Sequence, residues 1–139
     1  MLTNREVLEG YRSAGLEMKA LQEHIRLLGE LSGVQLMAVA EPCRAEAREA
    51  RLTEVEALQR ELDAKWAELS GLQRRFEGLM ARLPAMDRAL MRSYYVLGLS
   101  DEKTAESMNM SRSSVITRRH RCLTRIEALP ETEGRCPNA

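Results

Sequence analysis

Apolar side chains recur at alternating steps of three and four along two long stretches of the first eighty residues, which is the heptad pattern of a coiled-coil seam. In the first stretch, Thr3 and Glu6 have the spacing of a capping box, so a helix is expected to begin at Thr3. Its apolar row is Val7, Tyr11, Ala14, Met18, Leu21, Ile25 and Leu28. Residues 32–42, which contain a serine, a glycine and a proline, are expected to form a connector.

The second stretch runs from about Arg44 to Leu83 and contains no proline. Its row is Leu52, Val55, Gln59, Leu62, Trp66, Leu69, Gln73, Phe76, Met80 and Leu83. At about 1.5 Å per residue, the two helices would be about 40 and 60 Å long, so a simple hairpin leaves part of the longer row uncovered. The alternatives for covering it are a second copy of the chain and the C-terminal module, beside a monomeric hairpin with an irregular end.

Self-association is the favoured alternative, because Gln59 and Gln73 resemble the polar seam residues that set the register of coiled coils. The expected oligomer is a homodimer. The candidate oligomerisation residues are Tyr11, Met18, Leu21, Ile25, Leu28, Leu62, Trp66, Leu69 and Phe76.

A different unit follows Pro84, which ends the heptad pattern. The next helix offers an apolar face for a small core, made of Leu90, Met91, Tyr94, Tyr95 and Leu97. Gly98 suits the left-handed position that closes a helix. Ser100 is expected to cap a short helix from Asp101 to Met108, whose first turn carries acidic residues where the helix dipole favours them.

A turn at 109–111 connects this short helix to a longer one. Asn109 tolerates the positive φ that the turn requires, and Ser111 caps a helix expected from Arg112 to about Leu129. With Val115 at the centre of its buried side, Cys122 and Ile126 lie beside it at 100° per residue. The positions that face outward are Ser113, Ile116, Thr117, His120, Arg121 and Thr124.

Composition supports an all-α fold, since aromatic residues make up only 4% of the 139 residues and β-branched residues are few. The chain has 21 basic and 21 acidic residues, which gives a formal net charge of zero. Between Ser107 and Ile126, however, there are five arginines and no acidic residue. Charge distribution matters more than the sum for nucleic-acid binding, so the neutral total does not argue against it.

The segment "LPAMDRALMRSYYVLGLSDEKTAESMNMSRSSVITRRHRCLTRI" resembles region four of bacterial sigma factors and the related phage regulators of the RinA/ArpU type. The resemblance implies a helix-turn-helix that binds double-stranded DNA through its second helix, and in many cases contact with RNA polymerase. By this resemblance Tyr95 is the core tyrosine, Ala105 and Met108 are a packing pair, and Ser111 with Val115 begins the recognition helix. Asn109 replaces the usual turn glycine, and Arg119 occupies a position that is commonly apolar.

The candidate DNA-binding residues are Arg112, Ser113, Ser114, Ile116, Thr117, Arg118, Arg119, His120, Arg121 and Arg125. Arg121 faces outward enough to reach a guanine edge, and the stem of Arg119 is expected to pack while its guanidinium reaches a phosphate. Neither a metal nor a cofactor is expected, because Cys43, Cys122 and Cys136 form no metal-ligand spacing. No catalytic group stands out, so an enzyme is not expected.

The expected organisation is an oligomerising helical pair at 1–83, a helix-turn-helix at 84–129 and a flexible tail at 130–139. Without a membrane span or a signal peptide, the bacterial cytosol is the expected location. The function expected first is a sequence-specific transcription regulator encoded by a phage or prophage. The alternatives are the DNA-recognising small subunit of a phage packaging machine and a protein-interaction adaptor that docks on RNA polymerase.

Overall fold

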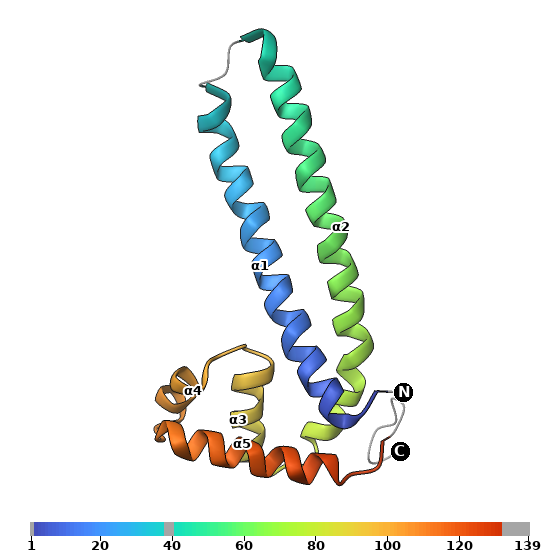
Figure 1. Ribbon diagram of the computed structural model, residues 1–139, viewed down its shortest axis with the longest axis vertical. Coiled ribbons are helices and arrows are strands. Elements are labelled where there is room, and N and C mark those ends of the chain that lie inside the picture. Colours follow the sequence, from blue (N-terminus) through green and yellow to red (C-terminus); the bar gives the residue numbers. More distant parts are fainter. Residues whose placement is uncertain (1, 38–40, 132–139) are drawn as a thin grey trace. The chain divides into compact units, whose positions relative to one another are not determined.

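The computed structural model describes residues 2–37 and 41–131, and these form five α-helices and no strand. The helices are α1 (Asn4–Met37), α2 (Glu41–Met80), α3 (Ala85–Tyr95), α4 (Asp101–Met108) and α5 (Arg112–Glu127) (Figure 1). The all-helical fold expected from the composition is confirmed. Most of the segment expected to form a flexible tail, residues 132–139, lies outside the described residues.

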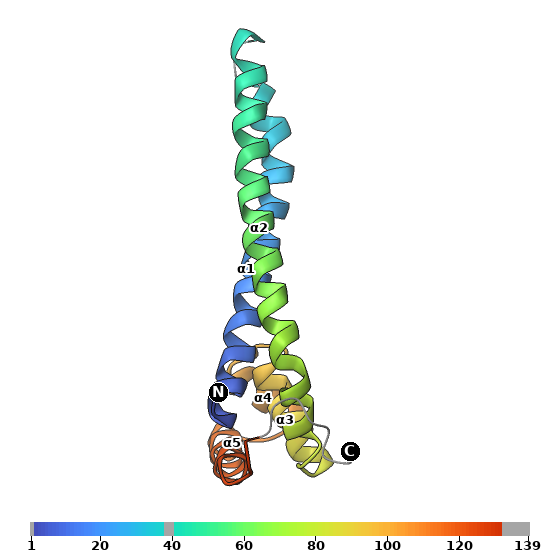
Figure 2. The same ribbon diagram turned by 90° about the vertical axis from the view of Figure 1, so that its right-hand side faces the viewer.

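The chain divides into two compact units. The first, which we call the composite unit, joins Met1–Leu16 with Glu68–Ala139, and the second, the hairpin unit, is Glu17–Ala67. The boundary drawn from the sequence after residue 83 therefore falls inside the composite unit. Within each unit α1 and α2 lie side by side and antiparallel (Figures 1 and 2).

The ends of the first two helices are set partly by local signals. Thr3 and Glu6 form the expected capping box: the Thr3 amide donates to Glu6 Oε2 at 2.8 Å, and the Glu6 amide donates to Thr3 Oγ1 at 3.1 Å. The connector expected at 32–42 was too long, since α1 continues to Met37 through its serine and glycine. The proline lies in the first turn of α2, where a missing N–H leaves no hydrogen bond unmade. Residues 38–40 lie outside the described residues.

The row of α2 that packs against α1 differs from the expected one at alternate positions only, since Val55, Leu62, Leu69 and Phe76 are buried or half-buried as expected. Leu52, Gln59, Trp66 and Gln73 are exposed, whereas the row one residue earlier, with Leu58, Lys65 and Leu72, is half-buried and ends in the buried Leu79. Both rows repeat every seven residues and both carry apolar side chains, so the heptad period did not distinguish them. Eight of the nine candidate oligomerisation residues are buried or half-buried within the chain: Tyr11, Met18, Leu21, Ile25, Leu28, Leu62, Leu69 and Phe76. Only Trp66 among them is exposed.

The core of the composite unit draws on every helix. Val7 and Leu8 of α1 are fully buried, and Tyr11 stacks on Phe76 with ring centroids 4.2 Å apart. The other buried members are Leu79, Met80, Leu83, Leu90, Met91, Tyr95, Ala105, Val115, Cys122, Leu123 and Ile126. Leu97, expected in this core, is 54% exposed because it follows the end of α3.

Asn4 connects three helices inside the composite unit. Its side chain is only 3% exposed, and its amide nitrogen donates to the backbone oxygens of Ile126 and Leu129, both at 3.0 Å. Its amide oxygen accepts from Arg75 Nη2 of α2 at 3.2 Å. Carbonyls at a helix end have no partner within the helix. The first residue of α1 therefore satisfies carbonyls at the C-terminal end of α5.

Replacing Asn4 by alanine removes both hydrogen bonds to these carbonyls and the one from Arg75, so Asn4→Ala is expected to lower the free energy of unfolding by about 1–3 kcal/mol. The control is Ser13→Ala at an exposed position of the same helix, where a change within about 0.5 kcal/mol is expected. Urea unfolding followed by circular dichroism measures both. Equal effects would show that the Asn4 side chain is not a structural connection.

A fragment restricted to residues 84–131 is expected not to fold stably, because it lacks the buried Val7, Leu8 and Phe76 of the shared core. A second chain in which residues 2–16 are joined to 68–131 by a short glycine-rich linker keeps the whole core and is expected to fold. Amide dispersion in NMR spectra compares the two. A folded 84–131 fragment would contradict the composite unit.

Candidate nucleic-acid interface

Local hydrogen bonds place α4 and α5 at the two sides of a tight turn. Ser100 Oγ accepts from the Lys103 amide at 3.2 Å and so caps α4. Asn109 ends α4 in the left-handed conformation with φ 54° and ψ 44°, and Gly98 ends α3 with φ 69°. Ser111 Oγ accepts from the Ser114 amide at 3.2 Å and caps α5. The two caps and the asparagine turn expected from the sequence are confirmed.

The buried side of α5 is the one centred on Val115. Val115 and Ile126 are fully buried, and Cys122 and Leu123 are nearly so. Burial raises the pKa of the Cys122 thiol, which keeps it a neutral apolar group. The opposite side is exposed over its whole length: Ser113, Ser114, Thr117, His120, Arg121, Thr124 and Arg125. Ile116, expected on this side, is half-buried.

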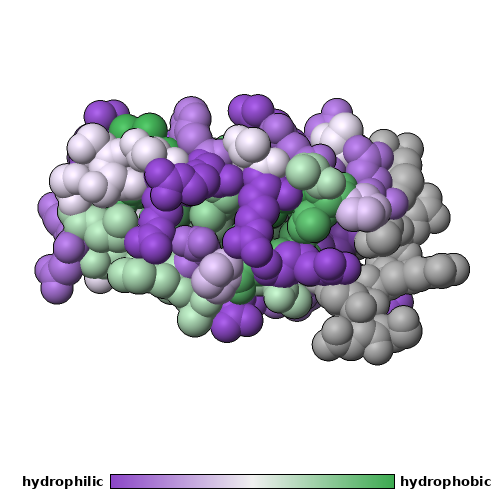
Figure 3. All heavy atoms as spheres, turned by 90° about the horizontal axis from the view of Figure 1, so that it is seen from below, coloured by the Kyte–Doolittle hydropathy of each residue, from purple (hydrophilic) through white to green (hydrophobic). Residues whose placement is uncertain are grey.

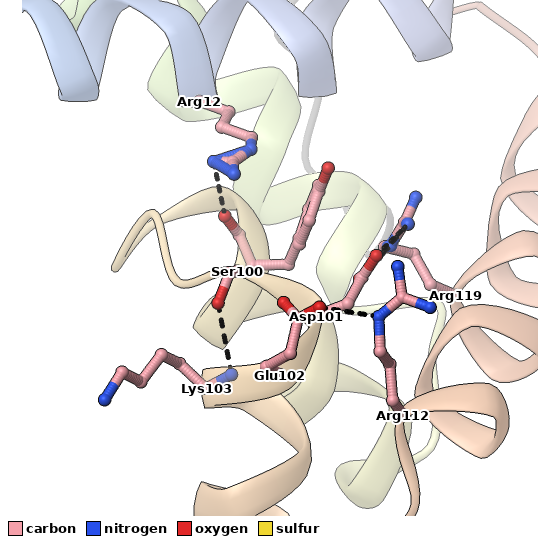
Figure 4. A network of polar contacts seen from close by, with 8 residues as sticks. Arg12, Ser100, Asp101, Glu102, Lys103, Arg112 and Arg119 are labelled. Atoms are coloured by element: carbon pink, nitrogen blue, oxygen red, sulfur yellow. Dashed lines mark hydrogen bonds and ion pairs between the residues drawn. The ribbon is translucent and has the colours of Figure 1, made fainter.

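Arg119, expected among the DNA contacts, does not lie on the exposed side of α5. Its side chain is only 12% exposed and forms a bidentate ion pair with Asp101 of α4, with Nη2 at 3.1 and 3.2 Å from the two carboxylate oxygens (Figure 4). Burial lowers the pKa of this guanidinium, but the Asp101 carboxylate, together with Tyr94 and Tyr95, more than offsets this and holds the pKa above its ordinary value. Arg119 therefore joins α5 to the start of α4.

Tyr94 of α3 lies between two guanidinium groups. The Arg119 guanidinium carbon is 4.2 Å from the ring centroid and that of Arg12 is 4.1 Å from it. Arg12 also donates to the backbone oxygen of Tyr94 at 3.5 Å. Cation–π contacts of this kind contribute about 0.5–2 kcal/mol, depending on how desolvated they are. The neighbouring Tyr95 is buried, which raises the pKa of its hydroxyl to about 12.

Two further arginines of α5 are paired with carboxylates of earlier helices. Arg112 Nε is 2.7 Å from Glu102 Oε1, and Arg118 Nε is 2.9 Å from Asp87 Oδ1. The backbone amide of Glu102, and next the Arg112 guanidinium, hold the pKa of the Glu102 carboxyl below its ordinary value. Counting Arg119, carboxylates of α3 and α4 neutralise three of the five arginines.

Arg121 and Arg125 make no ion pair within the described part of the chain, and both are exposed. Arg121 borders a shallow groove of about 370 Å³ at the N-terminal half of α5. The groove is lined by Met110, Ser113, Ser114, Thr117, Arg118 and Arg121. Figure 3 views the composite unit from the side of α5 and shows hydrophilic side chains spread over this face, with smaller apolar areas between them.

The structure thus brings together eight of the ten candidate DNA-binding residues at the exposed side of α5 or its edge. They are Arg112, Ser113, Ser114, Thr117, Arg118, His120, Arg121 and Arg125. Ile116 is half-buried and Arg119 is held in its ion pair. The contacts of Asn4 and Arg12 were not expected from the sequence, since nothing in the first turns of a heptad helix indicates contact with residues more than seventy positions away.

Among the described residues, no group of three or more histidine, cysteine, aspartate or glutamate side chains could hold a metal ion. No helix among them combines the length and the apolar character needed to cross a bilayer. Comparisons with protein-family models, with curated proteins and with solved structures find no match to this chain.

The two neighbouring arginines Arg119 and Arg121 are expected to differ in their effect on stability. Arg119→Ala removes one partner of a nearly buried pair and leaves the Asp101 carboxylate uncompensated, which costs about 3 kcal/mol. Arg121→Ala removes the same charge from an exposed position and is expected to cost less than about 0.5 kcal/mol. Thermal unfolding of both variants tests this. Similar losses would contradict the structural role of Arg119.

Proposed function

We propose that the chain is a sequence-specific DNA-binding transcription regulator that reads the major groove with the exposed side of α5. The observation that carries this proposal is the exposed row of hydroxyl, imidazole and guanidinium groups on α5. This helix begins at the Ser111 cap, directly after the Asn109 turn. A helix placed in this way behind a short support helix is the geometry by which helix-turn-helix proteins enter the major groove. The resemblance to sigma region four and to phage regulators supports a phage or prophage origin.

Three arginines of α5 have separate roles under this proposal. Arg121 has no carboxylate partner in the described residues and borders the groove, so it is the residue for a bidentate contact to guanine O6 and N7. Arg125 is exposed one turn further along and suits a phosphate. Arg119 positions α5 and does not contact the DNA.

Arg112 and Arg118 exchange partners on binding. The Arg112–Glu102 pair is 60% and 62% exposed, and an exposed pair contributes only about 0–1 kcal/mol. A charge-assisted bond to a phosphate is stronger, so releasing this pair costs little. The Arg118–Asp87 pair is less exposed, at 35% and 17%, and is expected to open less readily. The carboxylates therefore limit non-specific binding without blocking a correctly docked duplex.

DNA selected in vitro from a random pool and measured by fluorescence anisotropy tests the function. Arg121→Ala is expected to weaken binding by about 1–3 kcal/mol and to relax the sequence preference at one base pair. Arg125→Ala is expected to weaken binding to all DNA sequences alike and to reduce the slope of log affinity against log salt concentration by about one. Arg74→Ala, at an exposed position of α2, is the matched control and should leave binding unchanged.

Affinity is also expected to fall steeply as salt rises from about 50 to 200 mM, because phosphate contacts release counterions. A flat salt response, or no enrichment of any sequence in the selection, would contradict DNA binding. A reporter placed beside the selected sequence then tests transcription, with Arg121→Ala expected to abolish the effect on expression. An effect that survives this variant would favour a protein-interaction adaptor.

A further inference from the structure

The hairpin unit has one side on which large apolar residues are left uncovered. Leu52, Gln59 and Trp66 follow one another at steps of seven along α2, so they form one row beside the row that packs on α1. Leu52 is 57% exposed and Trp66 is 60% exposed. Trp66 is the only tryptophan of the chain. A tryptophan this exposed on a regular helix is uncommon unless the side chain has a partner.

Helix α1 contributes small and polar residues to the same side. Glu17 pairs with Lys65 at 2.9 Å, so residues of α1 and α2 whose numbers add up to about 82 lie opposite each other. Gln22 therefore lies level with Gln59, and Gly29 lies level with Leu52. A Cβ placed on Gly29 would meet nothing within 4 Å. The side thus has an apolar residue of α2 at each end of the row, a pair of glutamines between them and space beside Leu52.

Opposite charges border this side along its two edges. The edge on α1 carries Lys19 and Arg26, and the edge on α2 carries the acidic residues Glu49, Glu56 and Asp63, all at steps of seven and all exposed. Arg26 also pairs with Glu23 and Glu30 of its own helix, but these pairs are more than half exposed and contribute little. A basic edge and an acidic edge on one surface make that surface complementary to itself.

We propose that this side, the Leu52–Trp66 face, binds a second copy of the chain and forms a four-helix bundle. A two-fold axis brings the same surface of both copies together, and it can place each α1 against the α2 of the partner. In that arrangement the basic edge of each copy meets the acidic edge of the other. The alternative arrangement, with α1 against α1, would oppose like charges and is disfavoured.

The glutamines fit the same arrangement. Gln22 and Gln59 lie in the middle of the face, between the levels of Leu52 and Trp66. A single polar layer inside an apolar helical interface costs some stability but fixes the register of the helices. A partner of another kind would not need a surface whose apolar ends, polar centre and charged edges all match their own copy. The dimer forms without DNA, so it does not rest on the proposed function.

Sedimentation and Trp66 fluorescence of the purified full-length chain test the proposal, from about 1 to 100 µM. A dimer is expected, with Trp66 emission that shifts to shorter wavelength and loses its acrylamide quenching as the dimer forms. Trp66→Lys and Leu52→Lys are each expected to give a monomer with unchanged helix content. Leu27→Lys, at a 41% exposed leucine on another side of α1, is the matched control and should remain dimeric.

Reversing the charges tests the arrangement of the two copies. Lys19→Glu with Arg26→Glu should dissociate the dimer, and adding Glu56→Lys with Asp63→Lys should restore it. Arg121→Ala should remain dimeric, which separates this proposal from DNA binding. A monomer throughout the concentration range, a dimer that survives Trp66→Lys, or a fourfold variant that stays monomeric would each overturn the proposal.

Discussion

The buried amide of Asn4 is the interaction on which the arrangement of the composite unit depends. It accepts from a side chain of α2 and donates to carbonyls at the C-terminal end of α5, so one residue connects the beginning of α1, the last third of α2 and the end of the proposed recognition helix. The fully buried Val7 and Leu8 follow directly along α1. Helices α3, α4 and α5 are therefore one part of a larger core that also includes the first turns of α1.

The arginines of α5 differ in whether a carboxylate of α3 or α4 pairs with them. Arg119 is nearly buried, pairs with Asp101 and lies over the Tyr94 ring. Arg112 and Arg118 also pair with carboxylates, but their own side chains are more exposed than that of Arg119. Arg121 has no such carboxylate in the described residues. The same kind of side chain thus has a structural role at Arg119 and proposed roles in DNA binding elsewhere on α5, depending on its exposure and its partner.

The two proposals use different surfaces of helices that are continuous in the chain. Helices α1 and α2 each contribute to both compact units, so the face proposed for the second copy and the core that supports α5 belong to the same two helices. A transcription regulator built in this way would hold two recognition helices in one assembly, and half-sites on the DNA would follow its two-fold symmetry.

The sequence by itself determined the helical class, the short helices and their caps. Capping depends on residues three positions apart, and the turn at Asn109 depends on the φ that one residue tolerates, so these features are readable locally. The sequence also identified most of the exposed side of α5, because Val115, Cys122 and Ile126 mark its buried side at helical spacing.

The tertiary structure alone decided which row of α2 is buried, where Arg119 points and what Asn4 contacts. Two neighbouring rows of α2 share the seven-residue period, and only the placement of α1 selects between them. Arg119 lies 18 residues from its carboxylate partner, and Asn4 lies 122 residues from Ile126. Such contacts depend on the three-dimensional arrangement of distant segments, which no local pattern of residues encodes.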